Sequence, residues 1–433
     1  MENLLDVFHD IPISEADDRE SPLGNGGRYI VAPRTEAEIS RVLTYVKETA
    51  QTLNIIGGGT KQGFGGLHER ADILMTLASY KGIIEHSIGD MTMTVRAGTT
   101  MEEITNALAE KGQMVPIESA WSSHATIGGV IASNESGPKR LKYGSARDFV
   151  IGLRVVYPDG QVIRTGGKVV KNVAGYDMNK LFIGSMGTLG VISEVTLKLR
   201  PLPKYESAIH LSFSNDEIKS IQAFVQELLH SQMEPVAIEC LNPNVNQALF
   251  QKNAYGLLIS FEDYKKSVDA QEEWILEHCP KGGDLDRFQQ DEAKEVWQRL
   301  SNMGPSGASQ ASDGRIAIKM GSQTKDVFSL IEACDRLAEK DGLNLEAHGG
   351  LGHGLSKAYI EGHPEKLIAF INEIREVAEE ASGYVICTHL PLWLRQKVDV
   401  WGKVPAHFFL LEEIKRAVDP KGCLNIGRFL GGI

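Results

Sequence analysis

Two different patterns of apolar and polar positions divide the chain between residues 200 and 210. Before that point, short runs of β-forming residues alternate with glycine-rich loops, and residues 36–49 have the apolar spacing of an amphipathic helix. Beyond it, helical periodicity alternates with β-like runs, with helices expected at 215–229, 265–278, 291–302, 325–340 and 364–381 and strands at 236–239, 256–260, 315–320 and 384–387. The pattern predicts an α+β fold in which a strand- and loop-rich domain precedes an α/β domain.

We expect four segments: an N-terminal extension (1–24), a first domain (25–205), a second domain (206–405) and a C-terminal segment (406–433). The alternating helices and strands of the second domain favour a ferredoxin-like, split-βαβ cap that closes over a site on the first domain. The helix-like part of the C-terminal segment, residues 407–418, is expected to return to the first domain.

The chain has 44 glycines, and some of them form three clusters, at residues 57–66, 124–137 and 167–190. The first cluster follows a strand that ends at Ile56, and consecutive glycines let backbone N–H groups converge on an anion, although a plain turn would have the same composition. No P-loop pattern occurs, and Gln62 occupies the position where a dinucleotide-binding fingerprint needs its third glycine. Several glycine loops around one ligand indicate an extended cofactor that is held by backbone groups.

Short motifs in a fixed order carry a resemblance to a known family. They lie at 33–38, 57–60, 125–129, 143–148, 171–177 and 187–192, with two more at 398–402 and 419–428. Through them the chain resembles the FAD-binding PCMH-type domain of the vanillyl-alcohol oxidase superfamily. Within that superfamily it is most similar to the flavin-binding E subunits of bacterial glycolate oxidases, to which the stretch 167–177 is specific. The resemblance is strong over about residues 25–205, weak over 206–390, and returns near the C-terminal end. One departure is Ile426, which replaces the proline of the usual Asn-Pro-Gly-Arg pattern.

The resemblance implies a two-part FAD site. Its cofactor-binding residues would be Ile56, Gly57, Gly58, Gly59, Thr60, Lys61, Gly63, Thr126, Gly128, Gly129, Ala132, Ser133, Asn134, Val150, Gly152, Gly190, Val191, Ile192, Asn425 and Arg428. For Asn425 and Arg428, a helix C-cap is the alternative. Relatives that bond FAD covalently use a histidine where this chain has Thr60, or add a cysteine in the second or third cluster. No cysteine precedes Cys240, so we expect non-covalent FAD.

Oxidation of a 2-hydroxy acid by a flavin needs a cation for the carboxylate and a base for the hydroxyl proton. Arg315 and Lys319 lie on one face of a predicted strand and are candidates for the cation, with a solvated strand face as the alternative. His348, in a glycine-rich turn, is the candidate base, with a structural loop histidine as the alternative. A similar turn in related D-2-hydroxy-acid dehydrogenases has an aspartate and a second histidine where this chain has Leu351 and Leu355, so we expect no metal site.

Composition narrows the choice of partners. The balance of 45 basic and 57 acidic side chains argues against nucleic acid as the main partner. No apolar run could span a membrane and no signal peptide is recognisable, so we expect a cytoplasmic protein, held at the inner membrane at most through partners. The five isolated cysteines form no cluster motif. The resemblance therefore implies a second flavoprotein subunit and an iron–sulfur subunit as partners, with a self-sufficient homodimer as the alternative.

The sequence thus predicts an FAD-dependent oxidoreductase that acts on glycolate or D-lactate as one subunit of a complex. Two other functions stay open. One is an FAD-binding accessory or electron-transfer subunit without its own turnover, which the incomplete histidine turn favours. The other is an NADPH-dependent flavin reductase, which the extended cap and the lack of a nicotinamide motif oppose.

Overall fold

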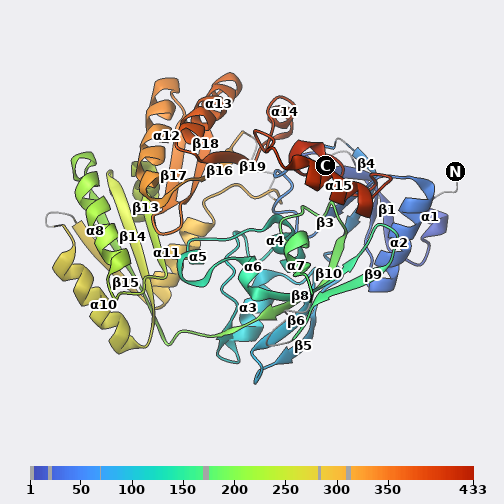
Figure 1. The fold of residues 1–433 in the computed structure, drawn as a ribbon, viewed down its shortest axis with the longest axis horizontal. Coiled ribbons are helices and arrows are strands. Elements are labelled where there is room, and N and C mark those ends of the chain that lie inside the picture. Colours follow the sequence, from blue (N-terminus) through green and yellow to red (C-terminus); the bar gives the residue numbers. More distant parts are fainter. Residues whose placement is uncertain (1–3, 18–21, 69, 169–174, 281–283, 309–313) are drawn as a thin grey trace.

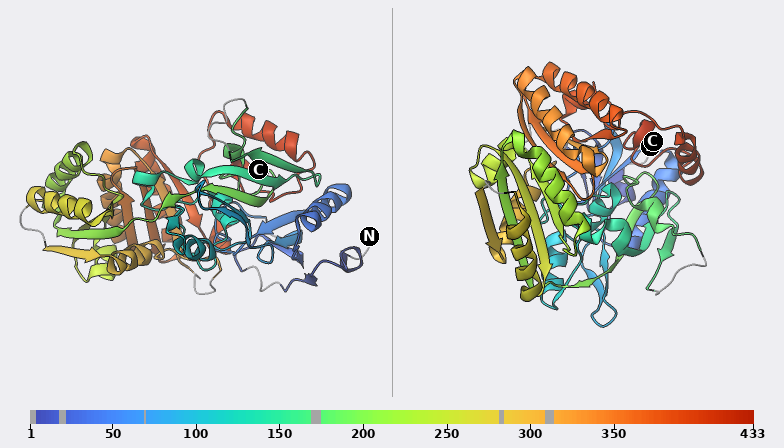
Figure 2. Two further views of the ribbon diagram at one scale, coloured as in Figure 1. Left: turned by 90° about the horizontal axis from the view of Figure 1, so that it is seen from below. Right: turned by 60° about the vertical axis from the view of Figure 1, so that its left-hand side comes forward.

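The computed structural model describes residues 4–17, 22–68, 70–168, 175–280, 284–308 and 314–433. It has the predicted α+β fold, with two small sheets at one end of an elongated molecule and one large sheet at the other (Figures 1 and 2). Part of the third glycine cluster, residues 169–174, lies outside the described residues. No helix among the described residues is long and apolar enough to cross a membrane.

The first small sheet has the strand order β1-β2-β4-β3. Its strands are β1 (Ile13–Glu15), β2 (Gly26–Val31), β3 (Leu53–Ile56) and β4 (Arg70–Thr76), and short helix α1 (Leu4–Val7) precedes them. The predicted amphipathic helix is α2 (Glu36–Thr49), which connects the parallel strands β2 and β3. Thr35 is the N-cap of α2, and its side chain accepts from the N–H of Glu38. The helix buries the apolar face that contains Val42.

The second small sheet is antiparallel, with the order β5-β6-β10-β8-β9. Its strands are β5 (Ile83–Ser87), β6 (Thr92–Arg96), β8 (Val150–Val156), β9 (Val162–Gly166) and β10 (Val191–Lys198). The helices around it are α3 (Met101–Ala109), α4 (Ile127–Ser133), α5 (Arg140–Tyr143), α6 (Ala146–Phe149) and α7 (Asn179–Phe182), and β7 (Gln113–Met114) pairs with β11 (Arg200–Pro201). Both small sheets contribute to one apolar core.

The large sheet has eight antiparallel strands in the order β15-β12-β14-β13-β17-β18-β16-β19. These are β12 (Tyr205–Phe213), β13 (Ala237–Leu241), β14 (Tyr255–Asp263), β15 (Asp284–Gln289), β16 (Ile316–Gly321), β17 (Asn344–Gly350), β18 (Leu355–Glu361) and β19 (Tyr384–His389). Each group of four strands has the βαββαβ order of a ferredoxin-like unit. The predicted cap therefore consists of two such units, joined edge to edge through β13 and β17.

Helices cover the two faces of the large sheet unequally. The helices are α8 (Ile218–His230), α9 (Pro243–Phe250), α10 (Lys265–His278), α11 (Asp291–Ser301), α12 (Val327–Asp341) and α13 (Pro364–Glu380). Helices α8, α10, α12 and α13 share a core with one face, whereas α9 and α11 pack on the other face, against β12–β15 and β17. In β16, Ile316, Ile318 and Met320 point into the helix-covered core. Because side chains alternate, Ala317 and Lys319 point away from it, toward the small sheets.

Helix α14 (Leu392–Arg395) leads out of the large sheet. The C-terminal segment then returns to the first small sheet with the predicted helix, α15 (Phe408–Val418), and ends in a 3-10 turn, Leu430–Gly432 (Figure 1). Leu424 forms a parallel β-bridge with Leu53 of β3 and is fully buried. The last residues of the chain therefore form part of the same core as the first sheet.

Candidate active site

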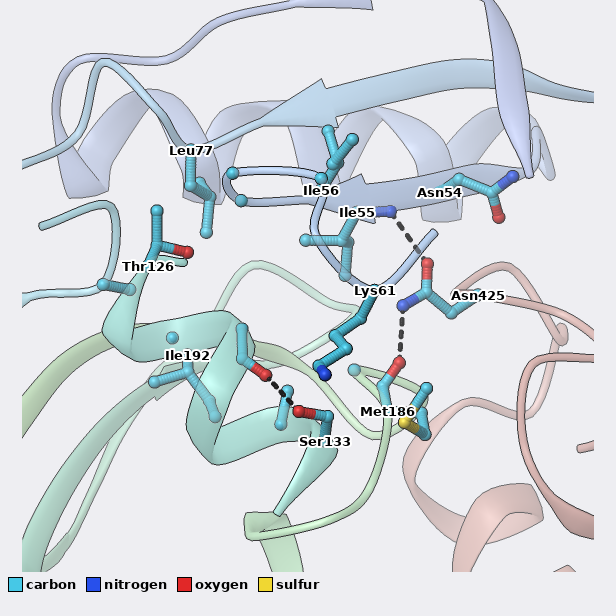
Figure 3. Close-up of a pocket in the computed structure, with 18 of the residues that line it drawn as sticks. Asn54, Ile55, Ile56, Lys61, Leu77, Thr126, Ser133, Met186, Ile192 and Asn425 are labelled. Carbon is cyan, nitrogen blue, oxygen red and sulfur yellow. Dashed lines mark hydrogen bonds between the residues drawn. The ribbon is translucent and has the colours of Figure 1, made fainter. Parts of the chain in front are cut away.

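A cavity opens between the two small sheets, and backbone from four separate segments forms its wall (Figure 3). The segments are the loop after β3, helix α4, the start of β10 and the C-terminal loop. The predicted cofactor residues that line it are Ile56, Gly57, Gly58, Gly59, Thr60, Lys61, Thr126, Gly128, Gly129, Ala132, Ser133, Gly190, Val191, Ile192, Asn425 and Arg428. An elongated cavity of this kind suits a ligand that is bound along its whole length.

Two glycines of the first loop are required by close packing against the second loop. A Cβ on Gly58 would lie 1.6 Å from the carbonyl oxygen of His124, and one on Gly57 would lie 2.1 Å from Oγ1 of Thr126. Within the described part of the chain, no hydrogen-bond partner occupies the backbone N–H groups of residues 57–61. The loop therefore offers a row of donors in a space without side chains, which fits a diphosphate group.

Asn425 fixes the C-terminal loop to the cavity wall (Figure 3). Its Oδ1 accepts from the N–H of Ile55 at 2.8 Å, and its Nδ2 donates to the carbonyl of Met186 at 2.7 Å. The residue has φ 42° and follows a loop rather than a helix end, so the helix-cap alternative does not apply. Arg428 also lines the cavity, and burial lowers its pKa to about 10.

Arg395, which the sequence reasoning did not identify, holds the first glycine loop in shape. Its guanidinium donates to the carbonyls of Leu23, Gln62, Gly65 and Gly66, and the side chain is buried. Burial, and then the nearby Arg428, lower its pKa to about 9, so it remains charged at neutral pH. Nothing local in the sequence signals this role, because Arg395 belongs to a short helix more than 300 residues away.

Four predicted cofactor residues lie outside this cavity. Gly63 packs against the ring of His389, and Asn134 lines a second cavity. Val150 is buried in β8, and Gly152, in the same strand, pairs with Gly166 of β9. Strand β8 therefore supports the cavity from behind rather than lining it.

A second cavity, of about 230 Å³, continues from the first toward the large sheet. Thr60, Lys61 and Ser133 line both cavities. The far wall of the second cavity is the half of the large sheet that α9 and α11 leave uncovered. A molecule bound there would lie between the glycine loops and the polar side chains of β16–β19.

The polar wall is a consequence of strand register. Residues His348 of β17, Lys357 of β18 and Lys319 of β16 are successive cross-strand partners and so form one row. In the next row on the same face, Tyr359 is the partner of Ala317. All five residues line the second cavity.

His348 is held by a buried carboxylate. Its Nδ1 lies 2.7 Å from Glu239 of β13, whose side chain is 1% exposed, and its Nε2 lies 3.4 Å from the hydroxyl of Tyr359. His353 approaches the other oxygen of Glu239 at 3.5 Å. Burial alone would raise the pKa of Glu239, but the hydrogen bond from His348 and the approach of His353 lower it, which keeps the carboxylate ionised. With Nδ1 donating to Glu239, Nε2 carries the lone pair of the ring and accepts from the hydroxyl of Tyr359 on the cavity side.

Cations dominate the rest of the wall. Lys61 forms an ion pair with Glu135 at 2.7 Å, whereas Arg140, Lys319 and Lys357 have no carboxylate within ion-pair distance among the described residues. Burial, followed by repulsion from Lys357, Arg140 and Lys61, lowers the pKa of Lys319 to about 8. This arrangement can bind an anion.

Arg315 does not reach this cavity, contrary to the prediction. Its guanidinium pairs with Glu346 and Glu361 and lies over the ring of Tyr359. Arg315 is on the predicted face, but these two carboxylates neutralise it at the edge of the sheet. Its role is to support the outer side of Tyr359.

His389, a lone histidine with no sequence motif around it, also lines the second cavity. Burial, and then the charges of Lys61 and Arg395, lower its pKa to about 4, so the ring is neutral at pH 7. Within the described ranges, no group of three or more metal-ligating side chains is arranged to hold a metal ion.

Several known proteins resemble this chain. Residues 28–166 match the family described as FAD binding domain. The chain is 28% identical to glycolate oxidase subunit GlcD of Bacillus subtilis over 92% of its own length and 88% of that protein, and 25% identical to D-lactate dehydrogenase of Archaeoglobus fulgidus over 92% and 90%. It is 35% identical to glycolate oxidase subunit GlcE of Escherichia coli, but over 43% of its length and 52% of that protein.

The predicted likeness to the E subunit is thus limited to part of the chain, whereas the D subunit matches nearly all of it. Among solved structures, p-cresol methylhydroxylase has a TM-score of 0.73 at 17% identity, covering 93% of this chain and 88% of that one. That likeness confirms the PCMH-type fold. Together with the cradle of glycine loops, the family match shows that the chain contains an FAD-binding domain of this fold and that FAD is its cofactor.

Proposed function

We propose that this protein is an FAD-dependent dehydrogenase that oxidises a small 2-hydroxy acid. The observation that carries the proposal is the wall of the second cavity, where a histidine–carboxylate pair and unpaired cations face the glycine loops of the FAD site. These groups suit the removal of a proton from a hydroxyl while a neighbouring carboxylate is held by the cations. FAD, when bound, would supply the hydride acceptor for the carbon that carries this hydroxyl.

The residues of the cap have separate tasks in this proposal. His348 takes the hydroxyl proton at Nε2, and Glu239 fixes the orientation of the ring and stabilises its charged form. Lys357, the cross-strand neighbour of His348, binds the carboxylate and holds the substrate against the flavin, and Lys319, one strand farther along, adds positive charge to the site. The neutral ring of His389 and the rings of Tyr359 and Phe64 exclude water from the cavity.

Glycolate and D-lactate are the first substrates to test, because the relatives are named for them. The assay is anaerobic titration of the FAD-loaded protein, followed by flavin absorbance, with each hydroxy acid and with NADPH. Bleaching by a hydroxy acid is expected. Bleaching by NADPH alone would favour a flavin reductase, and no bleaching by any of them would favour an accessory subunit.

The FAD is proposed to be non-covalent. Thr60, at the position of the covalent histidine of relatives, has no nucleophilic ring, and the described cysteines all follow residue 239. Acid precipitation of the holoprotein should leave the flavin in the supernatant. Flavin that stays with the pellet would contradict this proposal.

We further propose that a second flavoprotein subunit and an iron–sulfur subunit accept the electrons. Two relatives are named as subunits of glycolate oxidase, and the isolated cysteines of this chain supply no cluster motif. Such a complex would be cytoplasmic or bound to the inner membrane through its partners. Purification from the native cell tests it, and a chain that elutes alone and turns over at the rate of the extract would contradict it.

A further inference from the structure

The second cavity contains more positive charge than one carboxylate can neutralise. Four cations and two carboxylates line it in the described part of the chain: Lys61, Arg140, Lys319 and Lys357 against Glu135 and Glu239. Both carboxylates are already engaged, Glu135 with Lys61 and Glu239 with two histidines. Three cations are left for a ligand, and a glycolate or lactate ion carries one charge.

Glu118 forms no ion pair with any of the three cations in the described part of the chain. It accepts from the backbone N–H of Lys139 at 2.7 Å and faces the Lys139 ammonium, and it attracts Lys357 only from beyond ion-pair distance. Arg140 donates to the hydroxyl of Ser136, a neutral partner. Arg140, Lys319 and Lys357 are all partly buried and therefore repel one another until an anion binds. A group of unpaired like charges in a cavity is typical of a ligand site.

The three cations are also spread out rather than gathered at one point. Lys357 is the direct cross-strand neighbour of the base His348, and Lys319 lies one strand farther from it. Along this row, each of His348, Lys357 and Lys319 is separated from the next by about 4.8 Å, the distance between strands. Arg140 belongs to α5, outside this row of strands, and lines the same cavity. One carboxylate beside the reacting carbon can reach Lys357, which leaves Lys319 and Arg140 for a group at the far end of the substrate.

We propose that the substrate is a 2-hydroxy acid with a second anionic group at its far end, a carboxylate or a phosphate, and that Lys319 and Arg140 bind that group. This inference rests on the proposed function, since it places the reacting carbon beside His348. It predicts a preference for dianions such as 2-hydroxyglutarate or 3-phosphoglycerate over glycolate and lactate.

Binding can be measured apart from turnover. Glutarate and pentanoate have the same chain length and differ in one terminal carboxylate, and neither has a hydroxyl to oxidise. Isothermal titration of the FAD-loaded protein should give a Kd for glutarate that is about 10- to 100-fold lower than for pentanoate, the effect of one or two charge-assisted hydrogen bonds. Equal Kd values, or tighter binding of pentanoate, would overturn the proposal.

Variants assign the preference to the named cations. Lys319→Met should bind glutarate and pentanoate with similar Kd values, whereas Lys319→Arg keeps the charge and should keep the preference. Arg315→Met is the matched control, because Arg315 is on the same strand face but is neutralised by Glu346 and Glu361. A preference that survives in Lys319→Met and in Arg140→Gln would also overturn the proposal.

Turnover then separates this inference from the proposed function. The matched substrates are 2-hydroxyglutarate and 2-hydroxypentanoate, with 3-phosphoglycerate as the phosphate form. A lower KM for either dianion supports the inference and tells which group is used. Reduction of the flavin by 2-hydroxypentanoate with an equal or lower KM than both dianions would overturn the inference and leave the proposed function intact. Dianion binding without flavin reduction by any hydroxy acid would instead refute the proposed function.

Discussion

Replacement of His348 is the most direct test of the catalytic arrangement. The side chain is 5% exposed, is bonded through Nδ1 to Glu239, and directs Nε2 into the cavity. Loss of a positioned general base lowers the rate about 10²- to 10⁴-fold, or ~3–5 kcal/mol of transition-state stabilisation. His348→Gln should therefore lower kcat/KM by that factor, while FAD content stays normal because the residue belongs to the cap.

Glu239→Gln is the companion variant, since it removes the charge and keeps the shape. We expect a smaller loss, ~1.5–3 kcal/mol, as for one charge-assisted hydrogen bond. The pKa of Glu239 is lowered in the folded protein, so the pair stabilises the fold above the ordinary glutamate pKa and loses this effect as the pH falls. The variant should therefore reduce Tm more at pH 7 than in acid.

The assay is anaerobic stopped-flow reduction of the flavin by the hydroxy acid, with His353→Gln as the control. His353 also approaches Glu239, but at 3.5 Å. A His348→Gln protein with full FAD content and a kcat/KM within about threefold of the parent would refute the assignment of the base. If His353→Gln were as slow as His348→Gln, the loss of rate would not be specific to His348, and the base could not be assigned to it.

Three further outcomes are expected. Gly129→Leu should lower FAD occupancy in absorbance measurements without unfolding the protein, because a Cβ there meets only Oγ1 of Thr126, at 3.4 Å, and the side chain extends into the cavity. Gly89→Val, at an exposed position, is the control, and full occupancy in Gly129→Leu would contradict the cavity assignment. Arg395→Met leaves four backbone carbonyls without their donor and should cost ~3–5 kcal/mol of stability, seen as a lower Tm in melts of apo- and holoprotein; an unchanged Tm would contradict that role. Because the pKa of Lys319 is about 8, kcat/KM should fall above that pH as the cation is lost, and a profile that keeps this limb in Lys319→Arg would assign it to another group.

The glycine loops of the FAD cavity could be predicted because a run of glycines after a strand is visible in the sequence itself. The contact of Gly57 and Gly58 with the second loop, which explains why glycine is needed there, appears only in the fold. The strand alternation that puts Lys319 and His348 on the cavity side is also local. These parts of the site need no knowledge of how distant segments meet.

The remaining residues of the site depend on long-range register. Glu239 reaches His348 across 109 positions because β13 pairs with β17, the seam between the two ferredoxin-like units. Lys357 joins the row only because β18 lies between β17 and β16. Arg315 has the same strand face as Lys319 in the sequence, and only the folded chain reveals its two carboxylate partners. No pattern in one sequence specifies such pairings.

The bond between Ile55 and Asn425 joins positions that are 370 residues apart, and it forms one wall of the FAD cavity. During synthesis, the glycine loop around Gly58 leaves the ribosome long before the segment that closes the cavity over it. The two ferredoxin-like units must fold in between, since they connect the two halves of the cofactor site. We therefore expect capture of FAD to wait for the C-terminal segment, so that a chain that stops before residue 423 would bind FAD poorly although it has the glycine loops.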